Sequence, residues 1–227
     1  VQFATVANSE TPDNGSTILA GNQKVLSARL ADAKFFWDND LRVVNSSGLD
    51  LWLEKLKQVT FHNKLGSQFE RVERITDLSG TIAKKIGCDP NFAKSAASIS
   101  KTDLSSEMVY EFPELQGVMG TYYAVEAGFE ENIANACKEH YAPLGPSDKV
   151  PNSPISIVVA LADKIDTLTS FWAINEKPTG SKDPFALRRS ALGLIRIIIE
   201  NDIRISLSDI LALGYDGADI EDLKYFI

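Results

Sequence analysis

Helical periodicity is the feature that most constrains the fold of this chain. In the run GSQFERVERITDLSGTIAKKIG, apolar residues recur about every 3.6 residues from Phe69 to Ile86, and Gly87 follows where a helix would end. Similar spacing extends from Val25 to Trp37, and residues 155–174 indicate one long apolar helix. Further helical runs are expected at residues 51–59, 114–127, 130–141 and 184–201. These periods predict a mainly α protein.

The two ends of the chain differ from its middle. Val1, Phe3 and Val6 are roughly alternating apolar residues, as in a strand, and the polar run NSETPDNGST follows them with turn-forming residues. Without an initiator methionine, this beginning indicates a fragment of a longer protein. We expect residues 1–23 to be the end of a preceding β-containing domain with a short β-strand remnant. Residues 24–200 are then a helical domain, and residues 201–227 begin a following helical segment.

Composition limits the class of protein. The 227 residues are 44% hydrophobic, which is ordinary for a globular chain, and the net charge is −8. This charge argues against a general nucleic-acid binder with a basic surface, although a local basic patch stays open. We expect no membrane span and no signal peptide, because neither a run of eighteen apolar residues nor a leader pattern occurs. Cys88 and Cys137 lack metal-ligand spacing and are interpreted as reduced thiols of a cytoplasmic protein, with a disulfide left open.

The stretch Glu176–Asn201 combines an ordered turn with a helix and a group of basic residues. Asp183 is a good N-cap and Pro184 fits the first helical position, so we expect the helix to begin there. One face of this helix is apolar and is expected to be buried. Its members are Leu187, Ala191, Leu194, Ile195 and Ile198.

A stripe on the other side of this helix carries Arg189, Gly193, Arg196 and Glu200. The glycine is expected to leave a gap where a bulky anion or a partner backbone could approach. The preceding loop, Lys177 to Lys182, adds cations near a helix N-terminus, which favours phosphate. The alternative is a solvated surface on which Arg196 and Glu200, four residues apart, form a pair.

Two aspartates stand within apolar surroundings, Asp103 in SISKTDL and Asp163 in ALADKIDTL. Buried carboxylates are costly unless they are paired, hydrogen-bonded or bound to metal. The arrangement resembles the HD superfamily of metal-dependent phosphohydrolases. However, Thr102 stands where the His-Asp element has its histidine, and neither His62 nor His140 is in a ligand position. We therefore expect degenerate HD positions without a metal, in which both aspartates cap or hydrogen-bond neighbouring helices, and keep an active phosphohydrolase as the alternative.

Nucleotide-binding and nucleophile motifs are missing from the sequence. It contains no GxxxxGK[ST], GxGxxG or GxSxG pattern. We therefore expect no cofactor and no ATP site within this fragment.

Several long segments resemble signature blocks of the bacterial glycyl-tRNA synthetase β subunit family. They extend from about Asn22 to about Asp209, in the family's order; the segments are VLSARLADAKFFWDNDL, FHNKLGSQFERVERI, SKTDLSSEMVYEFPELQGVMGTYYA, PISIVVALADKIDTL and KPTGSKDPFALRRSALGLIRII. The resemblance implies a cytoplasmic glycine–tRNA ligase, a heterotetramer of two α and two β subunits. The α subunit would carry the class II site for ATP, Mg2+ and glycine. The β subunit would support binding of tRNA(Gly), and its middle would hold a degenerate HD domain without catalytic chemistry of its own.

The same resemblance implies where RNA or the α subunit could make contact. The candidates from the KPTGSKDPFALRR block are Lys177, Thr179, Gly180, Ser181, Lys182, Asp183, Arg188 and Arg189, and helical geometry adds Arg196. Lysine and arginine would hold the RNA backbone through charge-assisted hydrogen bonds without reading bases. In the block EFPELQGVMG, Pro113 and Gly117 are expected to shape a tight turn. A purely structural scaffold that never touches RNA remains the other interpretation.

Overall fold

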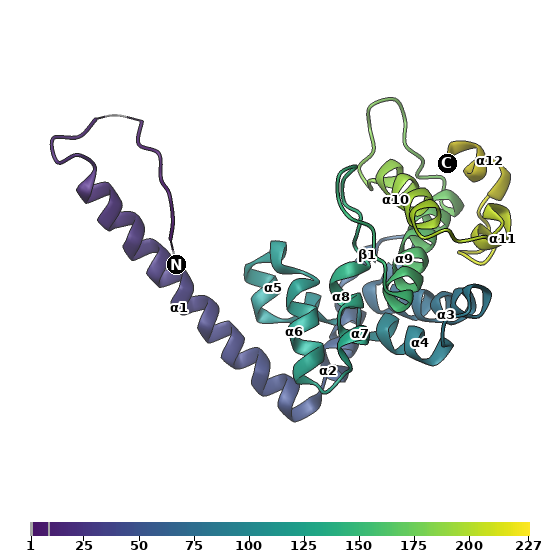
Figure 1. Ribbon diagram of the computed structural model, residues 1–227, viewed down its shortest axis with the longest axis horizontal. Coiled ribbons are helices and arrows are strands. Elements are labelled where there is room, and N and C mark those ends of the chain that lie inside the picture. The colour runs from purple at the N-terminus through teal and green to yellow at the C-terminus, as the bar shows by residue number, and fades with distance from the viewer. Residues whose placement is uncertain (1, 9) are drawn as a thin grey trace.

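The computed structural model describes residues 2–8 and 10–227 and confirms a mainly helical fold (Figure 1). Its only sheet within these ranges is a two-stranded antiparallel hairpin. The elements are α1 (Ser16–Ser47), α2 (Asp50–Lys55), η1 (Leu56–Gln58), β1 (Thr60–His62), β2 (Gly66–Ser67), α3 (Gln68–Ile86), α4 (Pro90–Ile99), η2 (Thr102–Ser105), α5 (Glu107–Glu111), η3 (Pro113–Leu115), α6 (Val118–Glu126), α7 (Glu131–Ala134), α8 (Ala136–Glu139), α9 (Pro154–Ala173), α10 (Leu187–Glu200), α11 (Leu207–Leu211) and α12 (Ile220–Phe226).

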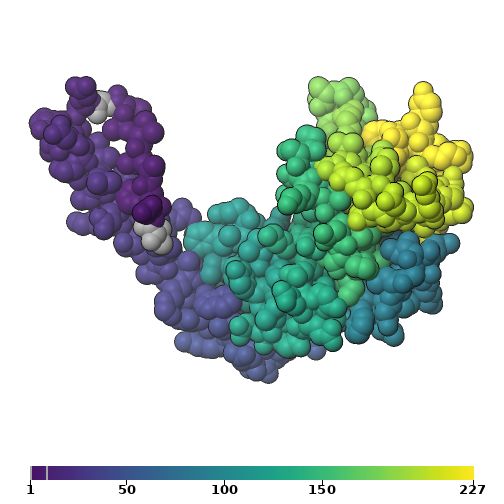
Figure 2. Space-filling view, viewed as in Figure 1, coloured from purple at the N-terminus to yellow at the C-terminus, as the bar shows by residue number. Residues whose placement is uncertain are grey.

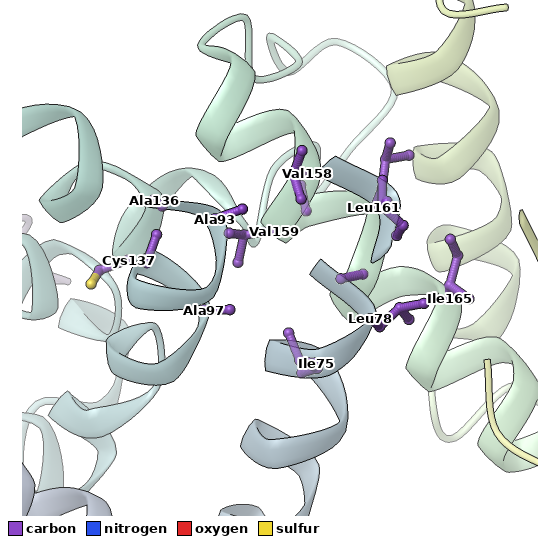
Figure 3. Packing of buried hydrophobic residues seen from close by; sticks show 14 of the residues in the cluster. Ile75, Leu78, Ala93, Ala97, Ala136, Cys137, Val158, Val159, Leu161 and Ile165 are labelled. Carbon is purple, nitrogen blue, oxygen red and sulfur yellow. The ribbon is translucent and has the colours of Figure 1, made fainter. Parts of the chain in front are cut away.

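Helix α9 is the centre of the packed body. Every residue from Ile155 to Trp172 is buried, because helices α3, α4, α7, α8, α10, α11 and α12 all pack against it. Figure 3 shows buried apolar side chains of these helices, among them Val159 of α9, Leu78 of α3 and Ala93 of α4, which belong to one hydrophobic cluster. Such an all-round apolar helix needs neighbours on every side. Its polar residues are consequently buried as well.

Helices α3 and α4 form a hairpin whose ends follow local sequence rules. Ser67 and Glu70 form a reciprocal capping box at the start of α3, and Gly87 ends the helix in the left-handed conformation, as its position predicted. Asp89 caps α4 through the N–H of Asn91, with Pro90 at the first helical position. These caps fix where α3 presents its polar side chains to α9.

Helix α1 projects from the body as an arm (Figures 1 and 2). Its 32 residues correspond to a length of about 48 Å, and only Asp40 and Val44, near its C-terminal end, are buried. Asp40 accepts hydrogen bonds from the backbone N–H groups of Glu107 and Met108 and from the Tyr123 hydroxyl. These bonds attach the C-terminal part of α1 to α5 and α6.

The predicted strand at the N-terminus is wrong for the residues that can be checked. Residues 2–8 form no strand, and Val1 lies outside the described residues. An alternating apolar pattern becomes a strand only beside a partner strand, and the residues of the described hairpin, β1 and β2, pair with each other. Helix α1 also begins at Ser16 and not near residue 22, so the expected boundary between residues 23 and 24 falls inside a helix. The division into domains stays a prediction.

The C-terminal residues pack on the same core as the rest. Ile210 and Leu211 of α11 and Leu223 of α12 are fully buried in the cluster that contains α9. Cys88 and Cys137 are both free thiols, as expected. None of the helices in the described part of the chain is long and apolar enough to cross a membrane.

Candidate functional site

The loop that connects α9 to α10 carries most of the basic candidates, and it projects from the body (Figure 1). Its tip is a tight turn in which Thr179 and Lys182 exchange two backbone hydrogen bonds, of 3.0 and 2.8 Å. Gly180 occupies the left-handed region at φ 51°, which a glycine adopts without strain. The turn therefore holds Ser181 and Lys182 in solvent on a short, hydrogen-bonded scaffold.

Helix α10 begins later than the sequence predicted. Its first residue is Leu187, preceded by Ala186 in the left-handed conformation at φ 53°, so Pro184 is not its first residue. Asp183 nevertheless satisfies the free N–H groups of the first turn, because its carboxylate accepts from Leu187 N (2.8 Å) and Arg188 N (3.0 Å). The predicted capping role of Asp183 is confirmed, but Pro184, Phe185 and Ala186 lie between this cap and the first residue of the helix.

Three cations near this turn are exposed: Lys182, Arg188 and Arg189. Arg188 donates through Nη2 to the carbonyl oxygen of Gly180 at 2.9 Å, which ties the loop tip to α10. Lys182 and Arg189 form no ion pair with any described residue. A polyanion could therefore approach these side chains without first displacing an internal carboxylate.

Two other candidates are held by internal contacts. Lys177 pairs with Asp222 at 2.7 Å, and its Nζ lies 5.4 Å from the Trp172 ring centre. Arg196 pairs with Glu200 at 2.7 Å, which confirms the surface pair that the sequence allowed. Arg196 also donates to the carbonyl oxygens of Gly145 (3.0 Å) and Asp148 (2.7 Å). Its position on the helix agrees with the prediction, but its guanidinium already fastens the 145–148 loop.

Gly193 lines a hollow of about 250 Å³ together with Arg188, Arg189 and Arg196, and it also packs closely against α9. Gly193 is buried, and a Cβ built there would lie 2.7 Å from Cε of Lys164 and 3.6 Å from Pro143. The buried face of α10 also includes Ile197, whereas Ile198 is only partly buried. The glycine therefore permits close packing of α10 against a lysine of α9, while a hollow remains between Arg189 and Arg196, where the sequence led us to expect one.

Asp103 lies in the short turn η2 and not within a longer helix as expected. Its Oδ2 accepts from the backbone N–H groups of Gly117 and Gly120, at the start of α6. Gly117 has φ 79°, and a Cβ on Gly120 would lie 3.1 Å from the carboxylate. This contact confirms the expected hydrogen-bonding role of Asp103 and shows why the predicted turn at Gly117 needs its glycines.

Asp163 is paired with two cations. Its Oδ1 lies 2.8 Å from Nζ of Lys101 and 3.0 Å from Nη2 of Arg71, and all three side chains are nearly buried. Arg71 Nη2 also donates to the Thr167 hydroxyl at 2.8 Å. The carboxylate that the sequence placed at a degenerate metal position is therefore neutralised by lysine and arginine.

Further charged groups extend this cluster. Asp166 pairs with Arg74 at 2.7 Å, one turn along α9. His140 lies on the other side, with Nε2 3.0 Å from Lys101 Nζ and Nδ1 2.9 Å from the Ala136 carbonyl oxygen. Lys164 donates to the carbonyl oxygens of His140 and Ala142. We call Arg71, Arg74, Lys101, His140, Asp163, Lys164 and Asp166 the buried charge cluster.

Burial and neighbouring charges shift the pKa values within the cluster. Burial would raise the pKa of Asp163, but Lys101 and Arg71 outweigh it and hold that pKa well below its usual range. Burial, together with the charge of Lys101, lowers the pKa of His140 to about 3, so this imidazole is neutral. Burial also lowers the pKa of Lys101, and that of Lys164 to about 8, against the opposing pull of Asp163.

Asp103 behaves in the opposite way. Burial raises its pKa to about 6, although the N–H groups of Gly117 and Gly120 favour the ionised form. Asp103 and Asp163 thus have separate partners. Among residues 2–8 and 10–227, no three His, Cys, Asp or Glu side chains group as a metal site requires.

The sequence missed most of this cluster because its members are far apart in the chain. Arg71 and Asp163 are separated by 92 positions, and helical periodicity says nothing about which helices meet. One signal was available. Arg71 and Arg74 are three apart on α3, and Asp163 and Asp166 are three apart on α9, so each pair lies on one helix face and could match the other.

Comparison with known proteins gives a consistent result. A sequence model of the family described as "Glycyl-tRNA synthetase beta subunit" matches residues 1–227. A protein named "Glycine--tRNA ligase beta subunit" from Ruegeria sp. (strain TM1040) is 64% identical over 99% of this chain and 33% of its own length. Proteins of the same name from Dinoroseobacter shibae and Paracoccus denitrificans are 66% and 59% identical, over 91% and 99% of this chain and 29% and 33% of theirs. The chain thus spans about a third of the length of these relatives.

Proposed function

The chain belongs to the glycyl-tRNA synthetase beta subunit family, and we propose that it helps a glycine–tRNA ligase to hold its tRNA. In this proposal a partner α subunit carries the ATP- and Mg2+-dependent class II chemistry, in a cytoplasmic assembly of two α and two β subunits. This part of the β subunit contributes binding and positioning, and no catalytic residue.

One observation carries the proposal: Lys182, Arg188 and Arg189 are exposed together around an ordered turn of a chain with net charge −8. Lysine and arginine form charge-assisted hydrogen bonds with phosphate oxygens. Such contacts fix the register of a nucleic acid on the protein but carry no base information. The Arg188 contact to Gly180 and the Asp183 cap hold the group in place before RNA arrives.

The phosphohydrolase alternative is not favoured. Asp163, its central carboxylate, is paired with Lys101 and Arg71, and Asp103 is bound to backbone N–H groups of α6. Thr102 stands at the histidine position, and Asp163 faces cations where zinc, iron or manganese would need imidazole or carboxylate ligands. The two carboxylates instead support the fold.

Binding of tRNA(Gly) by the full-length β chain, measured over a series of salt concentrations, tests this proposal. Alanine at Lys182, Arg188 and Arg189 should weaken binding, and each lost phosphate contact should reduce the slope of log K against log salt by roughly 0.7–0.9. An unchanged affinity and slope would contradict RNA binding here and favour the scaffold interpretation. Alanine at the exposed Lys84 and Lys85, on the last turn of α3, is the control.

A further inference from the structure

A pocket of about 270 Å³ opens between α9, α10 and the segment after α8. Four cationic side chains and one carboxylate line it: Arg71, Lys101, Lys164, Arg189 and Asp163. The chain as a whole is acidic, with net charge −8. An excess of positive charge in a concave site favours a small anion.

The cations of the pocket differ in how free they are. Lys101 and Lys164 are buried and held in place by His140, Asp163 and backbone carbonyl oxygens, and burial lowers the pKa of both. Arg189, by contrast, is exposed and forms no ion pair with any described residue.

Arg71 keeps unused donors at the same pocket. Its two hydrogen bonds, to Asp163 and Thr167, both use Nη2. Its Nε faces Asp166 Oδ2 at 3.6 Å, whereas its Nη1 forms no hydrogen bond with any described residue. A planar guanidinium with free N–H groups matches the geometry of phosphate oxygens.

Aromatic side chains form another wall of the pocket. Phe171 stacks on Phe185 with ring centres 4.2 Å apart, and Phe61 meets Phe171 edge-on at 5.8 Å. The Arg71 guanidinium lies 4.2 Å from the Phe61 ring centre, so the cationic and apolar walls meet there. The volume is near the lower end of small-molecule sites, which begin at about 300 Å³. A phosphate joined to one flat or sugar-sized group suits this combination.

We propose that this pocket binds the phosphate of a nucleotide, with the phosphate between Arg71 and Arg189 and the sugar or base against the phenylalanine wall. The nucleotide is either free in solution or part of a bound RNA strand, since both present the same chemistry. The site shares only Arg189 with the exposed group of Lys182, Arg188 and Arg189, and it stands even if that group does not touch tRNA. Its components come from widely separated parts of the chain, which explains why no nucleotide-binding motif marks it.

The test is nucleotide binding by the full-length β chain without its partner subunit, so that no other subunit contributes a nucleotide site. Adenosine 5′-monophosphate and inorganic phosphate are the probes, measured by calorimetry. Both should bind, with the nucleotide tighter because it also contacts the phenylalanine wall. Arg189→Ala should weaken both by about tenfold, the lower end for a hydrogen bond to a charged group.

A second variant fills the pocket, whereas Arg189→Ala removes a charge from it. Ser190→Trp puts a large ring into the pocket and should abolish nucleotide binding while the unfolding temperature stays near that of the wild type. Arg204→Ala removes an exposed arginine elsewhere and is the charge-matched control, with unchanged affinity. Absence of binding by either probe, or equal binding by wild type, Arg189→Ala and Ser190→Trp, would overturn the site.

Competition with tRNA(Gly) shows whether the pocket binds a free nucleotide or a nucleotide of a bound RNA strand. If tRNA displaces the mononucleotide from the wild type, the pocket takes a nucleotide of the RNA. If both bind together, the pocket takes a free nucleotide. Either outcome supports the site, and a failed tRNA-binding result for the Lys182 turn leaves this measurement unaffected.

Discussion

The buried charge cluster and the exposed basic turn use the same residue types for opposite purposes. Around Asp163, lysine and arginine are nearly buried and directly paired with a carboxylate. Around Gly180, Lys182 and Arg189 are exposed, without an ion pair to any described residue. Burial therefore decides what a cation does in this protein. A buried lysine or arginine stabilises the packing around α9, and an exposed one is available to a polyanion.

The largest effect is expected from Asp163→Ala. This change leaves Lys101 and Arg71 buried without their shared carboxylate, which costs about 3–5 kcal/mol of unfolding free energy. Urea unfolding followed by circular dichroism measures it. The matched control is Asp38→Ala, which breaks an exposed pair with Lys34 and should cost less than about 1 kcal/mol. Equal losses in the two variants would break the comparison between buried and exposed charge.

The next largest effect is expected on the stability of the fold at acidic pH. His140 has a pKa of about 3 in the folded chain against 6.5 ordinarily, so its unfolded form binds a proton first. The contribution of His140 to the free energy of unfolding is therefore fully present above pH 6.5. It decreases by about 1.4 kcal/mol per pH unit as the pH drops from 6.5 toward 3. His140→Gln should flatten that part of a curve of unfolding free energy against pH.

Asp103 opposes this trend, because its pKa is raised from 3.8 to about 6. The contribution of Asp103 to the free energy of unfolding is fully present below pH 3.8 and is lost as the pH rises through 6. This pH dependence is the reverse of that of His140. Asp103→Asn should therefore make the acid loss steeper between pH 6 and 3.8. If Asp103→Asn and His140→Gln change the slope in the same direction, the assignment of opposite signs fails.

A smaller effect is expected at the boundary between the two regions. Asp183→Ala removes the acceptor of the Leu187 and Arg188 N–H groups and should cost about 1 kcal/mol. Asp183→Asn keeps an acceptor and should recover most of the loss. If both variants are as stable as the wild type, the carboxylate does not cap α10.

The smallest stability effect is expected at the exposed turn itself. Lys182→Ala with Arg189→Ala should change the unfolding free energy by less than about 0.5 kcal/mol, because neither side chain is buried or paired. The same double variant should lose tRNA affinity. A decrease of several kcal/mol in the unfolding free energy would show that Lys182 and Arg189 also stabilise the fold. They would then not differ from the buried charge cluster.

Local chemistry made much of the fold predictable. The period from Phe69 to Ile86 and the cap at Gly87 gave α3 correctly, and the apolar run gave α9. The start of α10 was wrong by three residues, because Asp183 can cap from farther upstream with Ala186 in the left-handed region.

The candidate site was only partly predictable, since side-chain roles depend on what packs nearby. Arg196 was placed correctly on the helix, but the loop that occupies its guanidinium comes from 48 and 51 positions earlier. A hollow lies beside Gly193 as expected, but the close contact of this glycine with Lys164 of α9 could not be predicted from the sequence. The pocket of Arg71 and Arg189 was missed for the same reason, as its walls meet only in the folded chain.

The most direct test of the central claim is glycylation of tRNA by the complete enzyme carrying Arg188→Ala and Arg189→Ala, measured beside glycine-dependent ATP–pyrophosphate exchange. The control is another adjacent exposed pair, Lys84→Ala and Lys85→Ala. We expect kcat/KM for tRNA to fall in the arginine variant alone, while ATP–pyrophosphate exchange is unchanged. Glycylation equal to that of the wild type, or a parallel fall of glycylation and exchange, would contradict a role of the exposed turn in holding tRNA.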